Sequence, residues 1–287
     1  MGAEFGGDVV SSTRKDLEKS LIGNLADARS RADDLAGQLG MANEFSDRIY
    51  PILAGQRLAG RRIGVVGLGG LPGGTLNDIE SALEPTGANL VAVGVVREPP
   101  DTESLAGALA DTRFADLAKN PDTLQALGTG VGRQLVVGGN LLERSGSRLF
   151  SRLSGRFGNL DGVVVARDQP ENMNNRDREA TGRLETGLLD GIDGTGVEAV
   201  GVEPTDADPS SISFFADHGL STVDDIDLVP GKVAMVFALL GAEGNFGVKG
   251  SADRLLPDLL TPAPVIPAEP APGSRSPSVG SGRPAGR

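Results

Sequence analysis

The sequence predicts an α/β fold in which an N-terminal coiled-coil helix precedes a mostly parallel α/β sandwich domain and a disordered proline-rich tail. Three observations support this prediction. Apolar residues recur with a 4-3 spacing between residues 21 and 49, the pattern of a coiled-coil helix. From residue 61 on, Val-rich runs alternate with helical patterns, which is typical of parallel strands covered on both faces. The last 31 residues contain eight prolines, a composition that cannot bury a core.

The predicted coiled-coil helix occupies residues 11–55 and is expected to form a homodimer. Ser11, Ser12 and Thr13 can cap its start, and Pro51 is expected to end the periodic run. The period of 3.5 is sustained for about four heptads, and the densely charged flanks favour a coiled coil over a helix packed on its own domain. The expected dimerisation residues are Leu21, Leu25, Ala28, Ala32, Leu35, Leu39, Ala42 and Ile49.

Residues 60–256 are predicted to form the α/β domain. Strands are expected at 63–68, 90–96, 162–166, 197–202 and 233–239, and helices at 75–83, 102–119, 122–157 and 178–189. Residues 257–287 are assigned to the disordered tail. Residues 1–10 are assigned to a tag and a linker, because the first five residues resemble a cloning scar.

Composition limits the partners and the chemistry of this chain. Its net charge is −12, whereas nucleic acids and anionic membranes require a basic surface, so we expect no nucleic-acid partner. Cys is absent, which excludes thiolate metal sites and Cys nucleophiles. The single His would have to act as the base in any nucleophilic mechanism, and no Gly-x-Ser-x-Gly elbow accompanies it. We therefore expect a protein that is not an enzyme.

A glycine-rich turn after the first expected strand invites a dinucleotide-binding interpretation. Gly67 and Gly69 fit the first two places of the Gly-x-Gly-x-x-Gly fingerprint, but Pro72 stands where the third glycine belongs. Glu98 lies too far along the chain to be the ribose-binding acid. A tight turn without a ligand is the favoured interpretation, and a small-molecule-binding module stays open as an alternative.

One stretch near the C-terminal end of the domain matches no general motif for a metal, a nucleotide or a nucleophile. It consists of Ser221, Thr222, Val223, Asp224, Asp225, Ile226 and Asp227, followed by Pro230 and Gly231. This stretch resembles an actinobacterial family of copper transporters, the MctB-like family, which includes the cell-division protein SteB. The coiled coil, the α/β region and the tail follow in the order that the family shows.

The resemblance implies a membrane-anchored, extracytoplasmic protein of the cell envelope. The family also has a membrane helix, yet no window of this sequence holds the roughly 20 apolar residues that a span needs. Some members are associated with copper transport or homeostasis. Others are associated with cell-wall remodelling during division, together with a membrane-bound partner and a peptidoglycan hydrolase.

The residues favour the second of these functions, a dimeric scaffold, and copper homeostasis remains the alternative. Copper requires soft ligands, and besides Met1 the chain has only His218, Met41, Met173 and Met235. Met235 lies in an apolar run, and no two of these residues have ligand spacing. If copper binds at all, His218 and Met173 are the candidates. No cofactor is expected otherwise.

Overall fold

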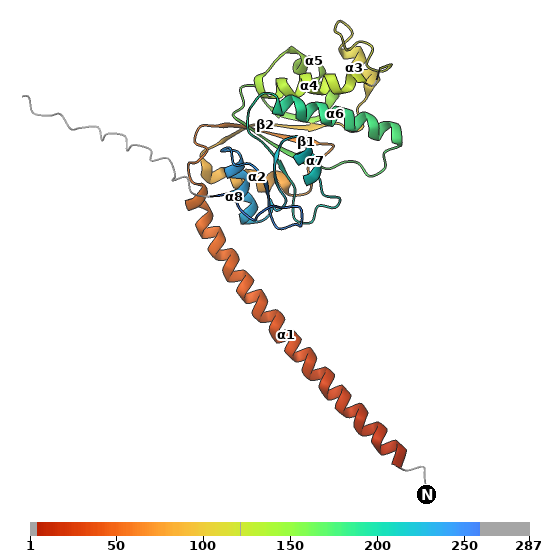
Figure 1. Ribbon diagram of the computed structural model, residues 1–287, viewed down its shortest axis with the longest axis vertical. Coiled ribbons are helices and arrows are strands. Elements are labelled where there is room, and N and C mark those ends of the chain that lie inside the picture. The colour runs from red at the N-terminus through yellow and green to blue at the C-terminus, as the bar shows by residue number, and fades with distance from the viewer. Residues whose placement is uncertain (1–4, 121, 259–287) are drawn as a thin grey trace, which may run out of the picture.

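A helix of 50 residues, α1 (Phe5–Ala54), projects from an α/β domain in the computed structural model (Figure 1). The structure describes residues 5–120 and 122–258, and burial from residue 17 onward. Residues 1–4 of the expected linker and residues 259–287 of the expected tail lie outside this part. An α-helix of this length spans about 75 Å. The predicted long N-terminal helix is confirmed.

Seven strands form one sheet in the order β3-β2-β1-β4-β5-β6-β7. Their bounds are β1 (Arg62–Leu68), β2 (Asn89–Val96), β3 (Phe150–Gly155), β4 (Gly162–Arg167), β5 (Ala199–Val202), β6 (Ser221–Val223) and β7 (Asn245–Phe246). All neighbours pair in parallel except β3, which runs antiparallel to β2. The predicted mostly parallel sheet is therefore confirmed. Because the chain leaves β1 toward β2 and later returns to β4 on its other side, the strand order reverses between β1 and β4.

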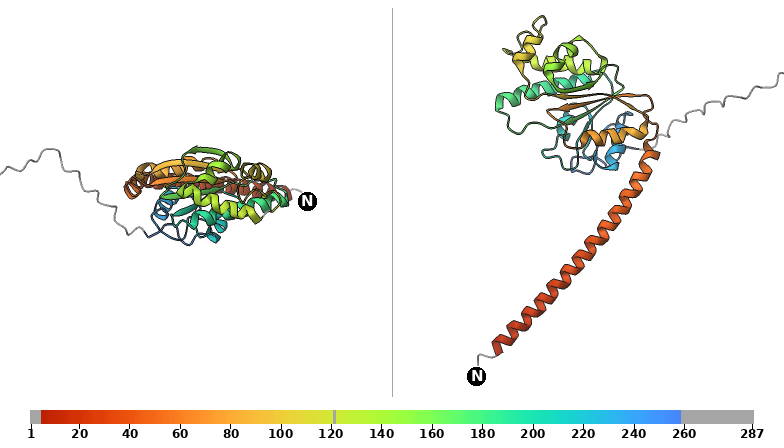
Figure 2. Two further views of the ribbon diagram at one scale, coloured as in Figure 1. Left: turned by 90° about the horizontal axis from the view of Figure 1, so that it is seen from above. Right: turned by 180° about the vertical axis from the view of Figure 1, so that it is seen from behind.

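Helices cover both faces of this sheet (Figures 1 and 2). They are α2 (Thr75–Leu83), η1 (Glu84–Thr86), α3 (Thr102–Ala108), α4 (Asp122–Val137), α5 (Asn140–Leu149), α6 (Asn175–Asp193), α7 (Ile212–Asp217) and α8 (Val229–Ala238). One core lies between the sheet and the α3–α6 layer, joined by α7. The other core lies between the sheet, α2, α8 and the last turns of α1. Both faces of the central strands are consequently buried, which explains their continuous apolar sequences.

Helices α4 and α6 pack with their backbones in contact. A Cβ at Gly132 would collide with the Leu188 carbonyl oxygen, and one at Gly187 would collide with that of Gln125. Only glycine fits at such an approach. The contact fixes α6 against the sheet and thereby places Glu185, a buried α6 side chain, at the sheet's carboxyl edge.

The strand predicted at residues 233–239 is wrong, because this segment forms helix α8. Pro230 stands in the first turn, where its missing N–H costs nothing. Nearly every side chain of α8 is buried between the sheet, α1 and α2. A helix that is apolar on all sides has no polar stripe, so periodicity cannot distinguish it from a buried strand.

Three helix boundaries also differ from the prediction. The helix expected over 102–119 ends at Ala108 and is followed by turns. The one expected over 122–157 divides into α4, α5 and the antiparallel strand β3. Pro51 does not end α1, which continues to Ala54, because its last turn packs on the domain. The break between α4 and α5 falls at Gly138 and Gly139, whose φ values of +85° and +155° are outside the helical region and favour glycine.

Candidate functional site

An apolar stripe runs along α1 and is exposed over most of its length. We call Leu21, Leu25, Ala28, Ala32, Leu35, Leu39, Ala42 and Ile49 the α1 stripe. Every described side chain from residue 17 to residue 45 is exposed, and Leu35 is exposed by 64%. Ile49 is half-buried and Tyr50 is buried, so α1 meets the domain only near its end. Packing on its own domain, the alternative weighed for this helix, is thus excluded for residues 17–45.

The glycine-rich turn after β1 is filled by atoms of the chain itself. Gly69 has a φ of +73°, and a Cβ there would lie 2.6 Å from Oε2 of Glu98. A Cβ at Gly67 would lie 2.6 Å from the Gly70 carbonyl oxygen. Because these glycines lack a Cβ, the backbone can form the tight turn and the Glu98 side chain can pack against it. This packing supports the interpretation of a tight turn without a dinucleotide.

The buried Glu185, the half-buried Glu98 and Arg167 meet where the strand order reverses. Arg167, the last residue of β4, donates from Nε to Glu185 at 2.7 Å and from a second nitrogen at 2.9 Å. Gln169 adds a third hydrogen bond to Glu185 at 2.8 Å, and Arg167 stacks over Phe214 with 4.2 Å to the ring centroid. Glu185 is fully buried, so this bidentate pair is well shielded from water.

Glu98 is the unusual member of this cluster. Neither of its buried carboxyl oxygens has a hydrogen-bond donor in reach. Burial first, and then the charge of Glu185, raise the pKa of Glu98 to about 9, although Arg167 opposes this shift. A protonated Glu98 can donate to Glu185, whereas two carboxylates have no proton to share. We therefore expect Glu98 to be a neutral acid at pH 7.

A cavity of about 430 Å³ opens beside this cluster, at the carboxyl ends of β4 and β5. It is lined by Pro72, Gly73, Arg167, Asp168, Gln169, Glu171, Pro204, Asp206, Ala207, Asp208, Pro209 and Ser211. Ligand crevices of open α/β sheets form at this place. The four acidic side chains of this lining are exposed, and its one cation, Arg167, is already paired with Glu185.

The stretch from Ser221 to Gly231, which resembles the family in sequence, spans β6, a loop and the start of α8, and its carboxylates have different environments. Asp224 accepts from the backbone nitrogens of Val248 at 2.8 Å and Lys249 at 3.1 Å. Asp227 accepts from the nitrogen and hydroxyl of Thr205, at 2.7 and 2.6 Å. These two residues tie neighbouring loops to the sheet edge.

Asp225 lacks such partners, although it is fully buried. Burial first, and then the charges of Asp224 and Asp227, raise the pKa of Asp225 to about 7. A Cβ at Gly231 would collide with the Asp225 carbonyl oxygen, so glycine is required where the stretch turns into α8. The stretch therefore connects β6 to α8 through a close backbone contact.

The potential soft copper ligands do not come together. His218 contacts Asp190 at 3.1 Å and Thr186 at 3.5 Å, and its ring packs edge-on against Phe214. Met173 contacts Thr181 near the start of α6, Met235 is buried in α8, and Met41 is exposed on α1. Within the described part of the chain, no three His, Cys, Asp or Glu residues are grouped to hold a metal. None of the contacts of the described residues joins His218 to Met173, the two candidate copper ligands.

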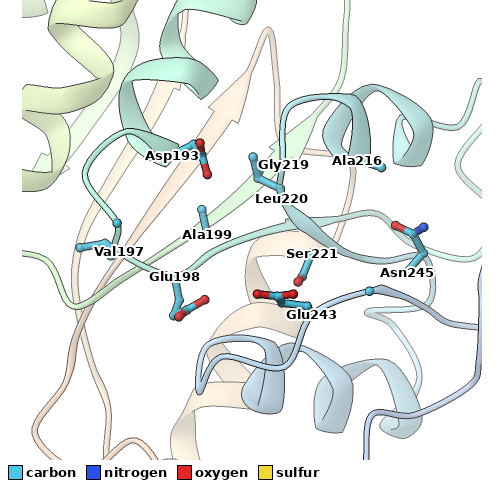
Figure 3. Close-up of a pocket in the computed structure, with 12 residues that line it drawn as sticks. Asp193, Val197, Glu198, Ala199, Ala216, Gly219, Leu220, Ser221, Glu243 and Asn245 are labelled. Atoms are coloured by element: carbon cyan, nitrogen blue, oxygen red, sulfur yellow. The ribbon is translucent and has the colours of Figure 1, made fainter.

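A second cavity, of about 440 Å³, lies at the amino ends of β5 and β6, whereas the first lies at the carboxyl ends (Figure 3). Asp193, Glu198 and Glu243 line it, together with Asn245 and Ser221. The Ser221 hydroxyl donates to the Ala242 carbonyl at 3.0 Å, so it is already engaged. Sequence reasoning missed this cavity, because its residues come from separate segments that share no motif.

The architecture defines the class of this protein as an α/β domain carried behind a long helix with an unpaired apolar stripe. The chain belongs to the MctB family, described as "Copper transport outer membrane protein, MctB", which matches residues 1–257. That description is of a membrane transport protein and not of an enzyme. No curated protein matches the chain. Among the described helices, none has the length and apolarity required to cross a membrane.

Proposed function

We propose that this protein takes part in copper transport or copper homeostasis at the cell envelope, as a non-enzymatic component that works through self-association. The observation that carries the proposal is membership of the MctB family across residues 1–257. The α1 stripe supplies the means of association. Burying exposed leucines between two helices is favourable by about 25 cal/mol per Å² of apolar surface.

Copper in this role is cargo and not a resident cofactor. His218 is engaged by Asp190 and Thr186, and Met173 precedes α6 and contacts Thr181. The nearby carboxylates are hard ligands, which suit Cu(I) poorly. We propose that a single α/β domain does not hold copper and that assembly with another copy or with a membrane partner supports transport.

A scaffold role in cell-wall remodelling is the second candidate. It is favoured by the α1 stripe and by the scattered soft ligands, since both suit a protein that acts through protein contacts. In this role a membrane-anchored, extracytoplasmic homodimer would present its domains to a membrane partner and a peptidoglycan hydrolase. The two candidates share the dimer and differ in whether copper is involved.

The dimer is tested by light scattering of the purified chain at micromolar concentration. Leu35→Asp places a charge in the centre of the stripe and is expected to give monomers. Ser30→Asp adds the same charge on the opposite face of α1 and should leave the dimer intact, because it lies outside the seam. A wild-type monomer would remove self-association from the proposal.

The copper role is tested in cells that lack this protein. Complementation with the wild-type chain is expected to restore growth at elevated copper, and Leu35→Asp is expected to fail. Cell length and septum position are recorded in the same cultures without added copper. Normal copper tolerance combined with defective septa would reject the copper role and support the scaffold.

A further inference from the structure

Strand β3 is an edge strand that the domain leaves uncovered. It pairs with β2 on one side, and no described strand pairs with its other side. Only Phe150 is buried, and the other five residues of β3 are exposed. At the opposite edge, Phe246 of β7 forms a bridge with Arg254, so part of that edge is covered. An uncovered edge presents unpaired backbone groups that can accept a further strand.

The β3 edge is basic although the chain is acidic overall. Arg152 lies within β3, Arg156 follows it directly, and both are exposed. Arg97 directly follows β2 at the end where β3 begins and is also exposed; its backbone nitrogen donates to the Leu149 carbonyl at 2.7 Å, whereas the Arg156 nitrogen donates to Val91 at the other end. None of the ion pairs within the described residues engages these three arginines. In a chain of net charge −12, this edge can attract an anionic partner.

An apolar cavity adjoins the same edge. It has a volume of about 580 Å³, and Leu142, Leu153 and Phe157 line it together with glycines and the polar residues Glu143, Ser147 and Arg156. Leu153 is exposed by 49%, and Gly155 lies two residues further on the same side of the strand. Side chains of a strand alternate between its two faces. A strand added to β3 would therefore direct every second side chain toward this apolar cavity.

We propose that β3 is a docking edge for an extended segment of a partner protein in which acidic and apolar side chains alternate. The segment adds to the sheet as an eighth strand. Main-chain hydrogen bonds hold it, the cavity accepts its apolar side chains, and Arg152 and Arg156 bind its carboxylates. A second copy of β3 is disfavoured as the occupant, because it would bring like charges together. The inference depends neither on copper nor on the α1 stripe.

The test uses eight-residue peptides that alternate Glu with Val or Leu, added to the full chain and followed by fluorescence polarisation. Binding is expected to slow amide hydrogen exchange across residues 150–155. Peptides with Pro at alternate positions cannot add a strand and should bind at least tenfold more weakly. Equal binding of the Pro peptides, or binding without protection of β3, would overturn the proposal.

Charge reversal provides the second arm. The double variant Arg152→Glu, Arg156→Glu should lose acidic-peptide affinity by at least tenfold and gain affinity for the Lys version of each peptide. The matched double variant Arg113→Glu, Arg176→Glu changes the net charge equally at exposed positions away from β3 and should bind like wild type. Failure of every peptide at millimolar concentration, or binding only to anionic phospholipid vesicles, would reject a protein partner at this edge.

Discussion

Helices α1 and α8 are both supplied with aliphatic side chains, but α1 exposes them whereas α8 buries nearly all of them. Along α1 the apolar residues form a narrow stripe on a charged helix, and Leu39 is exposed by 62%. In α8 apolar residues surround the helix, and Met235 and Val236 have no exposed surface. A periodic stripe without a neighbour indicates a missing partner, whereas an apolar surface on all sides indicates a core.

The largest expected loss of domain stability comes from a substitution in α8. Phe237 packs in the core and lies under the guanidinium of Arg57, 4.6 Å from its ring centroid. Phe237→Ala should destabilise the α/β domain by about 3–5 kcal/mol, because the cavity left behind cannot fully collapse. Leu35→Ala is the matched change on α1 and should alter domain stability by less than about 0.5 kcal/mol. Urea unfolding measures both, and similar losses would show that α1 packs on the domain.

The second largest effect is expected on the pH dependence of stability, which should differ between the α/β domain and α1. The pKa of Glu98 is raised from 4.5 to about 9 in the folded chain, so folding favours the protonated acid. Its contribution to stability is complete below pH 4.5 and is lost as pH rises toward 9, with a slope of at most about 1.4 kcal/mol per pH unit. Asp225, with a pKa of about 7, adds a loss in the same direction between its ordinary value of 3.8 and pH 7.

Glu98→Gln tests this dependence, because the amide imitates a neutral acid at every pH. Thermal unfolding between pH 5 and pH 9 should show a shallower decline for the variant than for wild type, and higher stability at pH 8. Self-association through α1 should not follow this profile, since Glu98 lies in the domain. A wild-type profile that stays flat would mean that Glu98 is ionised in the folded chain.

The smallest effect on stability is expected where the exposed part of α1 meets the α/β domain. Tyr50 is the first fully packed side chain of α1, and its hydroxyl donates to the Ala82 carbonyl of α2. Tyr50→Phe removes this hydrogen bond and should cost about 1 kcal/mol of domain stability, with the dimer retained. Calorimetric melting and light scattering on the same sample check both statements. If the Tyr50→Phe variant lost the dimer, the contact between Tyr50 and α2 would also be required to orient the α1 stripe.

Strands β1, β2 and β4 and the α1 stripe could be predicted from the sequence, because each is specified by a local pattern. Continuous Val-rich runs indicate strands buried on both faces, and the 4-3 spacing indicates a seam. The segment 233–239 could not be assigned in this way. Its side chains are uniformly apolar, and only contacts with the sheet and α2 decide between helix and strand.

The candidate site was equally inaccessible to local reasoning. Glu98, Arg167 and Glu185 come from three separate elements and share no motif, so nothing in the sequence indicates that they meet. The glycine-rich turn was compatible with a dinucleotide-binding turn or a tight turn without a ligand, and the side chain of Glu98 against Gly69 supports the turn without a ligand.

By itself the sequence determined the acidic charge, the lack of cysteine and the periodic helix, because composition and local periodicity need no tertiary context. It also carried the stretch from Ser221 to Gly231 on which the family resemblance rests, because those residues are contiguous in the sequence. Only the tertiary structure decided that the Glu98 carboxyl group is buried beside Glu185, that β3 is a bare basic edge and that α8 is a helix. Burial, edge position and charge proximity are relations between distant segments, and they exist only once the chain has folded.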